Sequence, residues 1–120
     1  MLNKTFADNF AHEWIAAWNA HDLDRILSHY ADDFEMTSPF IQAIAGNSTG
    51  RLKGKENVRE YWQRSLDKFP DLQFELLDVL FSVNSLTIYY KSVLDKRAIE
   101  WFWFGEDGKV LTAIAHYSAE

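Results

Sequence analysis

Cysteine is absent from the 120 residues of this chain. Its absence excludes disulfide bonds, thiolate metal ligands and cysteine nucleophiles. A chain that needs no disulfide suits a reducing compartment, so we expect a cytoplasmic protein.

Long apolar runs and an excess of basic residues are missing too. No segment reaches the roughly 20 apolar residues of a membrane-spanning helix, and residues 1–10 lack the apolar core of a signal peptide. We therefore expect no membrane contact. Acidic residues outnumber basic ones, 18 against 12, which gives a net charge of −6. Without a basic patch to meet a phosphate backbone, nucleic-acid binding is not expected either.

Glycine and proline are scarce, at five and two residues, and we find no linker, internal repeat or low-complexity tract. The length suits a single domain over residues 1–120. Aromatic residues, in contrast, make up 16% of the chain and include five Trp. That much ring surface exceeds the needs of a small core and indicates a lined cavity, a partner surface or both.

Apolar stripes at helical spacing predict three helices. The first stripe comprises Phe10, Trp14, Ala17 and Trp18, and its helix breaks at residues 21–22. The second comprises Leu23, Ile26, Leu27 and Tyr30, and its helix is expected to end at residues 32–33. The third comprises Val58, Tyr61, Trp62, Ser65, Leu66 and Phe69, and its helix closes at Pro70.

The remaining segments predict strands and one long loop. A short strand over 34–38 stops at Pro39, and the polar stretch 40–54 that follows is typical of a loop. Because long loops in compact domains are often lids, residues 42–53 are expected to cover a site. Four antiparallel strands follow, over 72–83, 86–94, 97–104 and 109–118, and the apolar face of the first switches midway, which predicts a β-bulge. Helices followed by such a meander indicate an α+β fold with helices on one face of a curved sheet.

Glu100 is the residue that fits its predicted strand least. Alternation places it between Ala98 and Phe102 on an apolar face. A carboxylate there must be paired, neutralised or solvated. Glu100 is therefore either a rim residue neutralised by Arg97 or a lysine, or an acid that faces a pocket.

The opposite face of the same strand carries Trp101 and Trp103. Two Trp side chains make a sheet face too apolar to remain in water. We therefore expect a homodimer through this outer face, to which Tyr89, Ile114 and His116 contribute by alternation.

Residues 16–39, AAWNAHDLDRILSHYADDFEMTSP, resemble the opening of the SnoaL-like branch of the nuclear transport factor 2-like (NTF2-like) superfamily. Residues 99–110, IEWFWFGEDGKV, resemble the strand–turn–strand near the C-terminus of that family. The resemblance covers nearly the whole chain. It implies a cone-shaped α+β barrel, in which a curved antiparallel sheet wraps around N-terminal helices and leaves a pocket at the open end. It implies no single activity, because this fold hosts isomerases, dehydratases, cyclases, hydrolases and non-catalytic subunits.

The enzymatic pattern most similar to this one is that of the ketosteroid isomerases of the superfamily. The resemblance puts their oxyanion-binding tyrosine at Trp14, their base at Ser38 and their late-strand acid at Glu100. Ser38 cannot accept a proton near neutral pH without a neighbouring base, and Trp14 has no hydroxyl. Steroid isomerisation is therefore not supported, whereas a pocket acid at Glu100 remains.

No metal site or cofactor is expected. The four histidines, His12, His21, His29 and His116, form neither a His-x-x-x-His nor a Glu-x-x-His pattern. None lies clearly on the pocket face, and His116 should point away from it by alternation. We interpret all four as structural.

The predicted pocket is mostly aromatic with a few polar tips, as small-molecule sites are. Its expected lining is Trp14, Trp18, Phe34, Met36, Ser38, Trp62, Tyr90, Glu100, Phe102, Ala113, Ala115 and Tyr117. The same rings could instead simply fill the cone. Three functions stay open: a binding protein for a small apolar or cyclic ligand, a cofactor-independent lyase, isomerase or cyclase using Glu100 as acid or base, and a non-catalytic dimeric interaction module.

Overall fold

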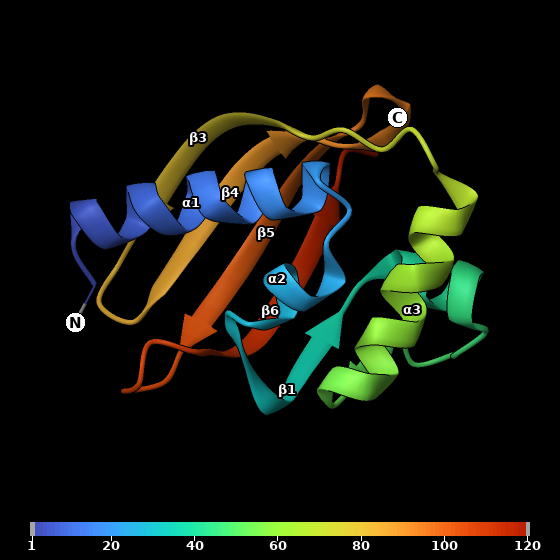
Figure 1. Cartoon of the computed structure of the whole chain (residues 1–120), viewed down its shortest axis with the longest axis horizontal. Coiled ribbons are helices and arrows are strands. Elements are labelled where there is room, and N and C mark those ends of the chain that lie inside the picture. The colour runs from blue at the N-terminus through green and yellow to red at the C-terminus, as the bar shows by residue number, and fades with distance from the viewer. Residues whose placement is uncertain (1, 120) are drawn as a thin grey trace.

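The computed structural model describes residues 2–119 and contains one six-stranded sheet with helices packed on its inner face. The helices are α1 (Lys4–Asn19), α2 (Leu23–Leu27) and α3 (Lys55–Lys68). The strands are β1 (Tyr30–Thr37), β2 (Arg51–Lys53), β3 (Glu75–Phe81), β4 (Ser85–Lys91), β5 (Arg97–Phe104) and β6 (Val110–Tyr117). Figure 1 shows α1 crossing one face of the curved sheet and α3 lying beside β1. The predicted α+β class, with a curved sheet around N-terminal helices, is confirmed.

Two details of the sheet differ from an all-antiparallel barrel. The order is β2-β1-β6-β5-β4-β3, so the sheet is open, with β2 and β3 at its edges. The β1–β6 pair is parallel, with Met36 opposite Ala113, while the other neighbouring pairs are antiparallel. Alternation within a strand shows which residues face inward, but it does not show which strand lies alongside or in what direction.

The first helix forms as its stripe predicts. Asn3 caps it by accepting a hydrogen bond from the Phe6 N–H at 2.8 Å, which satisfies one of the free amides of the first turn. The helix ends where His21 adopts a left-handed φ of 56°. Asp22 then caps α2 through the Arg25 N–H at 3.1 Å. The predicted break at residues 21–22 is confirmed.

The second predicted helix was too long, because it included residues that belong to β1. The structure ends α2 at Leu27 and begins β1 at Tyr30, so Asp32 and Asp33 lie within the strand. Tyr30 is buried, and its hydroxyl accepts a hydrogen bond from Trp14 Nε1 at 3.0 Å. This tertiary contact outweighs the helical spacing of Tyr30 in the sequence.

The stretch read as a loop over 40–54 contains ordered elements. A π-helical turn, η1 (Ile41–Ala45), is anchored by the buried Ile41. Strand β2 then pairs with β1, with Leu52 opposite Met36. The sequence pattern did not indicate either element, because polar residues surround the few apolar ones. The expected lid over 42–53 stays a prediction.

Three strands of the meander, β3, β4 and β6, are shorter than predicted. Strand β3 begins at Glu75 rather than at residue 72, and its register shifts between Leu76 and Asp78, which confirms the bulge. Strand β4 ends at Lys91, before a 3-10 turn, η2 (Val93–Asp95), in which Leu94 has a positive φ of 58°. A left-handed residue breaks the extended backbone that a strand needs.

The two faces of β5 follow the predicted alternation. Glu100 and Phe102 are buried on the inner face. On the outer face, Trp101 and Trp103 stack with ring centroids 6.1 Å apart, and Trp103 is 42% exposed.

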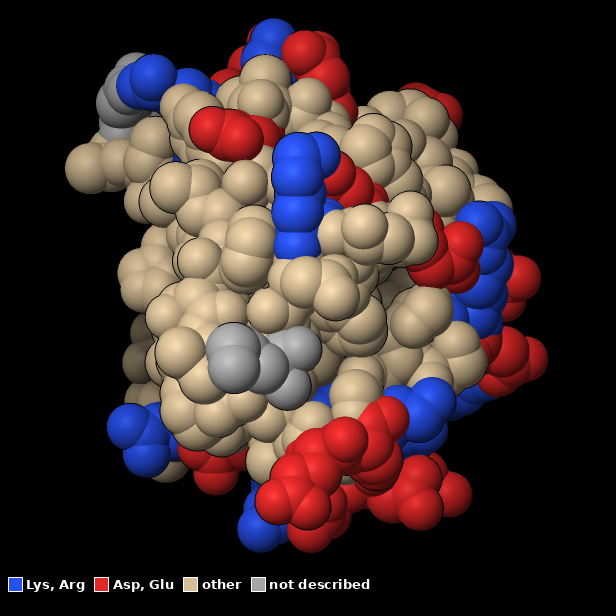
Figure 2. Space-filling model, turned by 90° about the vertical axis from the view of Figure 1, so that its left-hand side faces the viewer, with Lys and Arg blue, Asp and Glu red and all other residues tan. Residues whose placement is uncertain are grey.

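The side of the molecule drawn in Figure 2 shows no basic patch. Figure 2 shows Lys and Arg scattered among Asp and Glu at one end of the molecule, around a broad uncharged area. Among the residues described, none of the helices combines the length and apolar character needed to cross a bilayer.

Candidate functional site

A cavity of about 50 Å³ lies between α1, α3 and the inner face of the sheet. Its lining residues come from both helices, β1, β4, β5, β6 and the connecting segments around η1 and η2. Small-molecule sites commonly enclose roughly 300–1,000 Å³. The cavity is far below that range, so a ring-shaped ligand enters only if side chains around the opening move.

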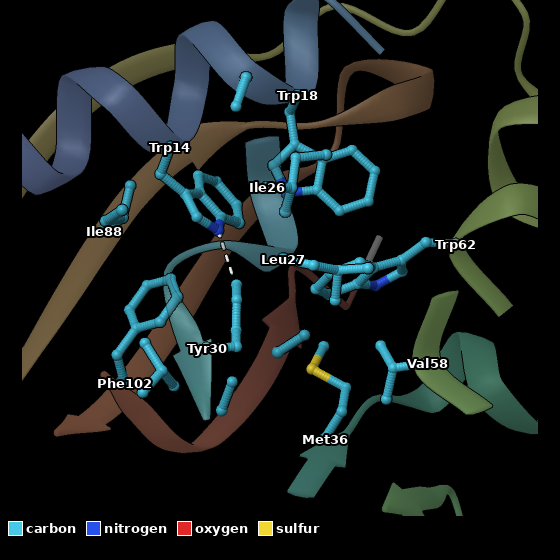
Figure 3. Packing of buried hydrophobic residues seen from close by; sticks show 14 of the residues in the cluster. Trp14, Trp18, Ile26, Leu27, Tyr30, Met36, Val58, Trp62, Ile88 and Phe102 are labelled. Carbon is cyan, nitrogen blue, oxygen red and sulfur yellow. Dashed lines mark hydrogen bonds between the residues drawn. The ribbon is translucent and has the colours of Figure 1, made fainter. Parts of the chain in front are cut away.

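One wall of the cavity is built from aromatic rings on three separate elements. Trp14 and Trp18 descend from α1 and Trp62 reaches in from α3, as Figure 3 shows. The Trp18 and Trp62 rings meet edge to face at 5.0 Å, and Phe74 stacks on Trp14 at 5.7 Å. Tyr90 meets the Trp14 ring edge-on at 5.1 Å. Such contacts hold rings in defined orientations, so the wall presents fixed aromatic surface.

Glu100 supplies the acid of this cavity. It is 3% exposed and lies between the cross-strand neighbours Ile88 and Ala115. Burial raises its pKa to about 8, and a hydrogen bond that the Tyr90 hydroxyl donates to Oε1 at 3.4 Å offsets only part of this rise. This burial and the place of Glu100 on the cavity wall fit the interpretation of an acid that faces a pocket. A rim residue neutralised by Arg97 or a lysine would be more exposed, and the role of Glu100 stays a prediction.

Hydroxyl groups gather next to Glu100. The side chain of Tyr117 has the hydroxyl groups of Ser38 and Tyr90 as hydrogen-bonding neighbours. The Tyr61 hydroxyl donates a hydrogen bond to Ser38 Oγ at a long 3.5 Å. Burial raises the pKa of Tyr61 to about 12 and raises those of Tyr90 and Tyr117 as well. These phenols therefore stay protonated at neutral pH and act as hydrogen-bond donors.

Together, the walls and the acid allow two kinds of chemistry. The aromatic faces can enclose a flat ring, while the protonated carboxyl and the phenols can donate hydrogen bonds to an oxygen on it. Because the pKa of Glu100 is about 8, both protonation states are populated near neutral pH, which is the requirement for moving a proton.

Comparison with known proteins identifies the family. A family model described as the SnoaL-like domain matches residues 11–113. The chain belongs to the SnoaL-like domain family. A search among curated proteins found no significant match.

Solved structures extend this assignment. A SnoaL-like protein of unknown function from Burkholderia thailandensis E264 is 52% identical, over 98% of each chain, with a TM-score of 0.93. A SnoaL-like family protein from Agrobacterium tumefaciens C58 is 14% identical, over 96% of this chain and 99% of its own, with a TM-score of 0.77. An NTF2-like protein from Cytophaga hutchinsonii ATCC 33406 is 11% identical, over 93% and 89%, with a TM-score of 0.71. The last two support the fold alone.

Within this SnoaL-like domain, the predicted pocket residues divide into two groups. Those on the cavity wall are Trp14, Trp18, Met36, Trp62, Tyr90, Glu100 and Tyr117. Those packed in the core beneath it are Phe34, Ser38, Phe102, Ala113 and Ala115. The second group shares the inward-facing pattern of the first, because alternation cannot distinguish a cavity wall from the layer behind it.

Other lining residues were not predicted. They are Phe40, Ile44, Tyr61, Ser65, Phe69, Leu72, Phe74, Ser92 and Val93. Most come from turns or from the ends of elements, where no regular period indicates the inward side. Tyr61, Ser65 and Phe69 could have been predicted, because they share the third helical stripe with Trp62.

The isomerase positions are occupied differently in this family member. Trp14 Nε1 already donates to the Tyr30 hydroxyl, so that N–H is engaged within the protein. Ser38 is buried, and its Oγ accepts a hydrogen bond from the Phe40 N–H at 3.2 Å. Neither residue reproduces the role that the ketosteroid isomerases assign to its position.

The histidines have structural contacts. His12 Nδ1 lies 2.8 Å from the Asp8 carbonyl, and His21 Nε2 lies 2.8 Å from the Leu72 carbonyl. His29 Nε2 lies 3.2 Å from Glu13 Oε2. Within residues 2–119, no three His, Asp or Glu side chains gather as a metal site would require.

Proposed function

We propose that this SnoaL-like protein binds a small, flat, cyclic molecule carrying a carbonyl or hydroxyl group, in the cavity beside Glu100. The observation that carries the proposal is a buried carboxyl placed at the edge of an aromatic wall. Buried carboxyl groups in a purely structural core are rare unless paired. Glu100 has instead a hydroxyl neighbour, Tyr90, and a cavity in front of it.

The shape of the lining supports a flat ligand. Trp14, Phe74 and Tyr90 contact one another ring to ring, and such surfaces favour stacking or edge contacts with another ring. The partly exposed lining residues Phe40 and Val93 lie in or next to the short turns η1 and η2. Movement of these turns would enlarge the small cavity without disturbing the sheet.

A thermal-shift and tryptophan-fluorescence screen of cyclic ketones and phenols tests the proposal. We expect ligands whose affinity falls as pH rises through about 8, because ionised Glu100 no longer donates a hydrogen bond. Glu100→Leu should weaken these ligands, whereas the exposed control Glu56→Gln should not. The proposal fails if no compound binds, or if binding is indifferent to both pH and Glu100→Leu.

A second candidate is a cofactor-independent isomerase, lyase or cyclase with Glu100 as general acid and base. The Glu100 pKa of about 8 favours this candidate, because a general acid or base works best when its pKa lies near the ambient pH. The Agrobacterium tumefaciens relative is named as a candidate isomerase, although its 14% identity supports only the fold. NMR detection of deuterium exchange next to the carbonyl of bound ketones, and turnover of epoxides, would distinguish it. Activity that survives Glu100→Gln would contradict this assignment.

A further inference from the structure

The turn between β4 and β5, residues 92–96, has a backbone that does not suit its sequence. Leu94 and Asp95 both have a positive φ of 58°. The Lys96 N–H closes the turn by donating to the Val93 carbonyl at 3.2 Å. Two central residues with positive φ are the mark of a type I′ turn, in which Asn-Gly is strongly preferred. Aspartate tolerates this conformation, whereas a bulky residue such as leucine rarely adopts it.

Packing does not account for Leu94 either. Its side chain is 74% exposed, the highest value among the large apolar residues that the structure describes. The residue is therefore strained in its backbone and unburied in its side chain. Strained residues of this kind are concentrated at sites where a conformational change is part of the function.

The same turn separates two hollows of the molecule. On its inner side, Ser92 and Val93 line the cavity of about 50 Å³. On its outer side, they line a surface groove of about 410 Å³ together with Leu94. Phe69 and Leu72, which follow α3, belong to both hollows as well. The cavity alone is too small for a typical ligand, but the cavity and the groove together reach the roughly 300–1,000 Å³ of small-molecule sites.

Few contacts tie this turn to the rest of the protein. The Ser92 N–H donates to the Lys96 carbonyl at 2.7 Å, so this hydrogen bond also lies within the turn. In the part of the chain that the structure describes, no backbone hydrogen bond joins residues 93–95 to another segment. The Val93 side chain is partly buried against the core. Val93 is thus the contact that holds the turn against the cavity.

We propose that residues 92–96 form a gate between the cavity and the outer groove. The closed state is the one described above, in which Val93 covers the cavity. When Leu94 leaves its left-handed conformation, Val93 swings outward and the two hollows become one site. The strain at Leu94 raises the free energy of the closed state and so keeps the open state populated. The inference goes beyond the proposed function, because the gate operates in the ligand-free protein.

The absence of cysteine permits a direct test, since one introduced Cys is the only thiol of the chain. Ser92→Cys puts a thiol on the buried inner side of the turn, and Ala113→Cys puts one in the core on β6. Iodoacetamide alkylates accessible thiols, and intact-protein mass spectrometry follows the reaction. Relative to the rate of each variant in denaturant, we expect Ser92→Cys to react at least tenfold faster than Ala113→Cys, because only the first thiol is exposed by a local opening.

A second comparison tests the strain. Leu94→Asn combined with Asp95→Gly gives the turn the sequence that its backbone prefers. This change should slow the alkylation of Ser92→Cys at least tenfold, the effect of relieving about one strained residue. It should leave that of Ala113→Cys unchanged. The matched control Leu80→Asn removes another exposed leucine, on β3, and should alter neither rate.

Hydrogen exchange provides a readout without any cysteine. Opening of the gate breaks the bond from the Lys96 N–H to the Val93 carbonyl. After correction for intrinsic rates, the Lys96 amide should therefore exchange faster in the wild type than in the Leu94→Asn, Asp95→Gly variant, while amides of β5 exchange alike in both.

Three results would overturn the gate. They are alkylation of Ser92→Cys as slow as that of Ala113→Cys, no effect of the Asn-Gly turn on the Ser92→Cys rate, and equal protection of the Lys96 amide in both turns. None of these measurements needs a ligand. Failure of the gate would therefore leave the proposed binding intact, and a cavity that binds none of the screened compounds would leave the gate intact.

Discussion

Glu100 places one ionisable group in an otherwise apolar part of the core. Its neighbours on the inner face of β5 are Ala98 and Phe102, and all three are buried. Desolvation disfavours the charged carboxylate, so its pKa rises from 4.5 to about 8. The side chain is thus a neutral hydrogen-bond donor over most of the physiological range.

This raised pKa predicts a pH-dependent stability. A folded-state pKa above the unfolded value means that the folded protein holds the proton longer, so the associated stability is complete below about 4.5 and is lost as pH rises through about 8. The loss between pH 5 and pH 8 is roughly 3 kcal/mol. Glu100→Gln, which does not ionise, should therefore stabilise the ligand-free protein more at pH 8 than at pH 5 in chemical denaturation.

A direct check is the carboxyl NMR titration of Glu100, assigned with Glu100→Gln. A midpoint at or below 4.5 would show a paired or solvated carboxylate and would remove the pocket acid. Glu13 is not a suitable reference in this experiment. Its hydrogen bonds to Arg25 lower its own pKa to about 2.

At the scale of elements, Glu13 links the first two helices. Its carboxylate accepts two hydrogen bonds from Arg25, at 2.8 and 2.6 Å, and lies 3.2 Å from His29 Nε2. Bidentate pairs of this kind have a defined geometry. The pair therefore sets how α2 is positioned against α1, at the point where the chain turns toward β1.

Glu13→Gln should lower the free energy of unfolding by about 1 kcal/mol at pH 7, a modest value because the side chain is 33% exposed and screened by water. The folded-state pKa is lowered, so this stability exists above 4.5 and is lost as pH falls through about 2. The free energies of unfolding of the variant and of the wild type should therefore converge toward pH 2. Glu60→Gln, which breaks the exposed pair with Arg64, is the control and should change stability less. If Glu13→Gln changed the free energy of unfolding equally at pH 7 and at pH 2, the charge of Glu13 would not be the cause.

The segment around η1 is the second element with a testable property. Phe40 packs on Tyr117 at 4.5 Å and Ile41 is buried, but residues 46–49 have few apolar anchors. We expect amides of residues 42–50 to exchange faster than those of β5 in the ligand-free protein, and to slow when a cavity ligand is bound. Hydrogen exchange measured by mass spectrometry decides this, and exchange as slow as in β5 without ligand would contradict a lid.

At the scale of the whole molecule, the outer face of the sheet carries apolar side chains that are exposed to water. Trp101 and Trp103 stack on it, and Ile99 and Leu111 are exposed as well. Isolated exposed apolar residues are ordinary, whereas a contiguous apolar face is typical of an interface.

We predict that the protein is a homodimer through this face. Trp103→Glu should give a monomer or an aggregate, because a carboxylate would be buried without a partner in the interface. Glu106→Gln, a change in the adjacent turn, serves as a control that leaves the apolar face intact. Sedimentation velocity at micromolar concentration provides the measurement, and a stable wild-type monomer would refute the prediction.

Local pattern alone was enough for much of this protein. The stripe of α1, the break at His21 and the alternation of β5 were all predicted, because each depends on the period of a single element. The inward position of Glu100 and the outward position of Trp103 follow from the same alternation. The family resemblance added the cone shape, in which the sheet wraps around the helices and leaves a pocket at the open end.

Tertiary structure decided what depends on contacts between distant residues. Tyr30 belongs to a strand because Trp14 donates to its hydroxyl, sixteen residues away. The β1–β6 pair is parallel because strand pairing depends on the path of the whole chain. Neither fact can be inferred from the period of one segment.

The same division applies to the site. The sequence by itself determined that an acid and several tryptophans face inward, since side-chain direction is a local property. Only the tertiary structure decided that, among residues 2–119, Trp18 Nε1 has no acceptor while Trp14 Nε1 has one, and that Ser38 is buried without lining the cavity. Hydrogen-bond partners and cavity walls are formed by residues from several elements at once, and no single stretch of sequence records that assembly.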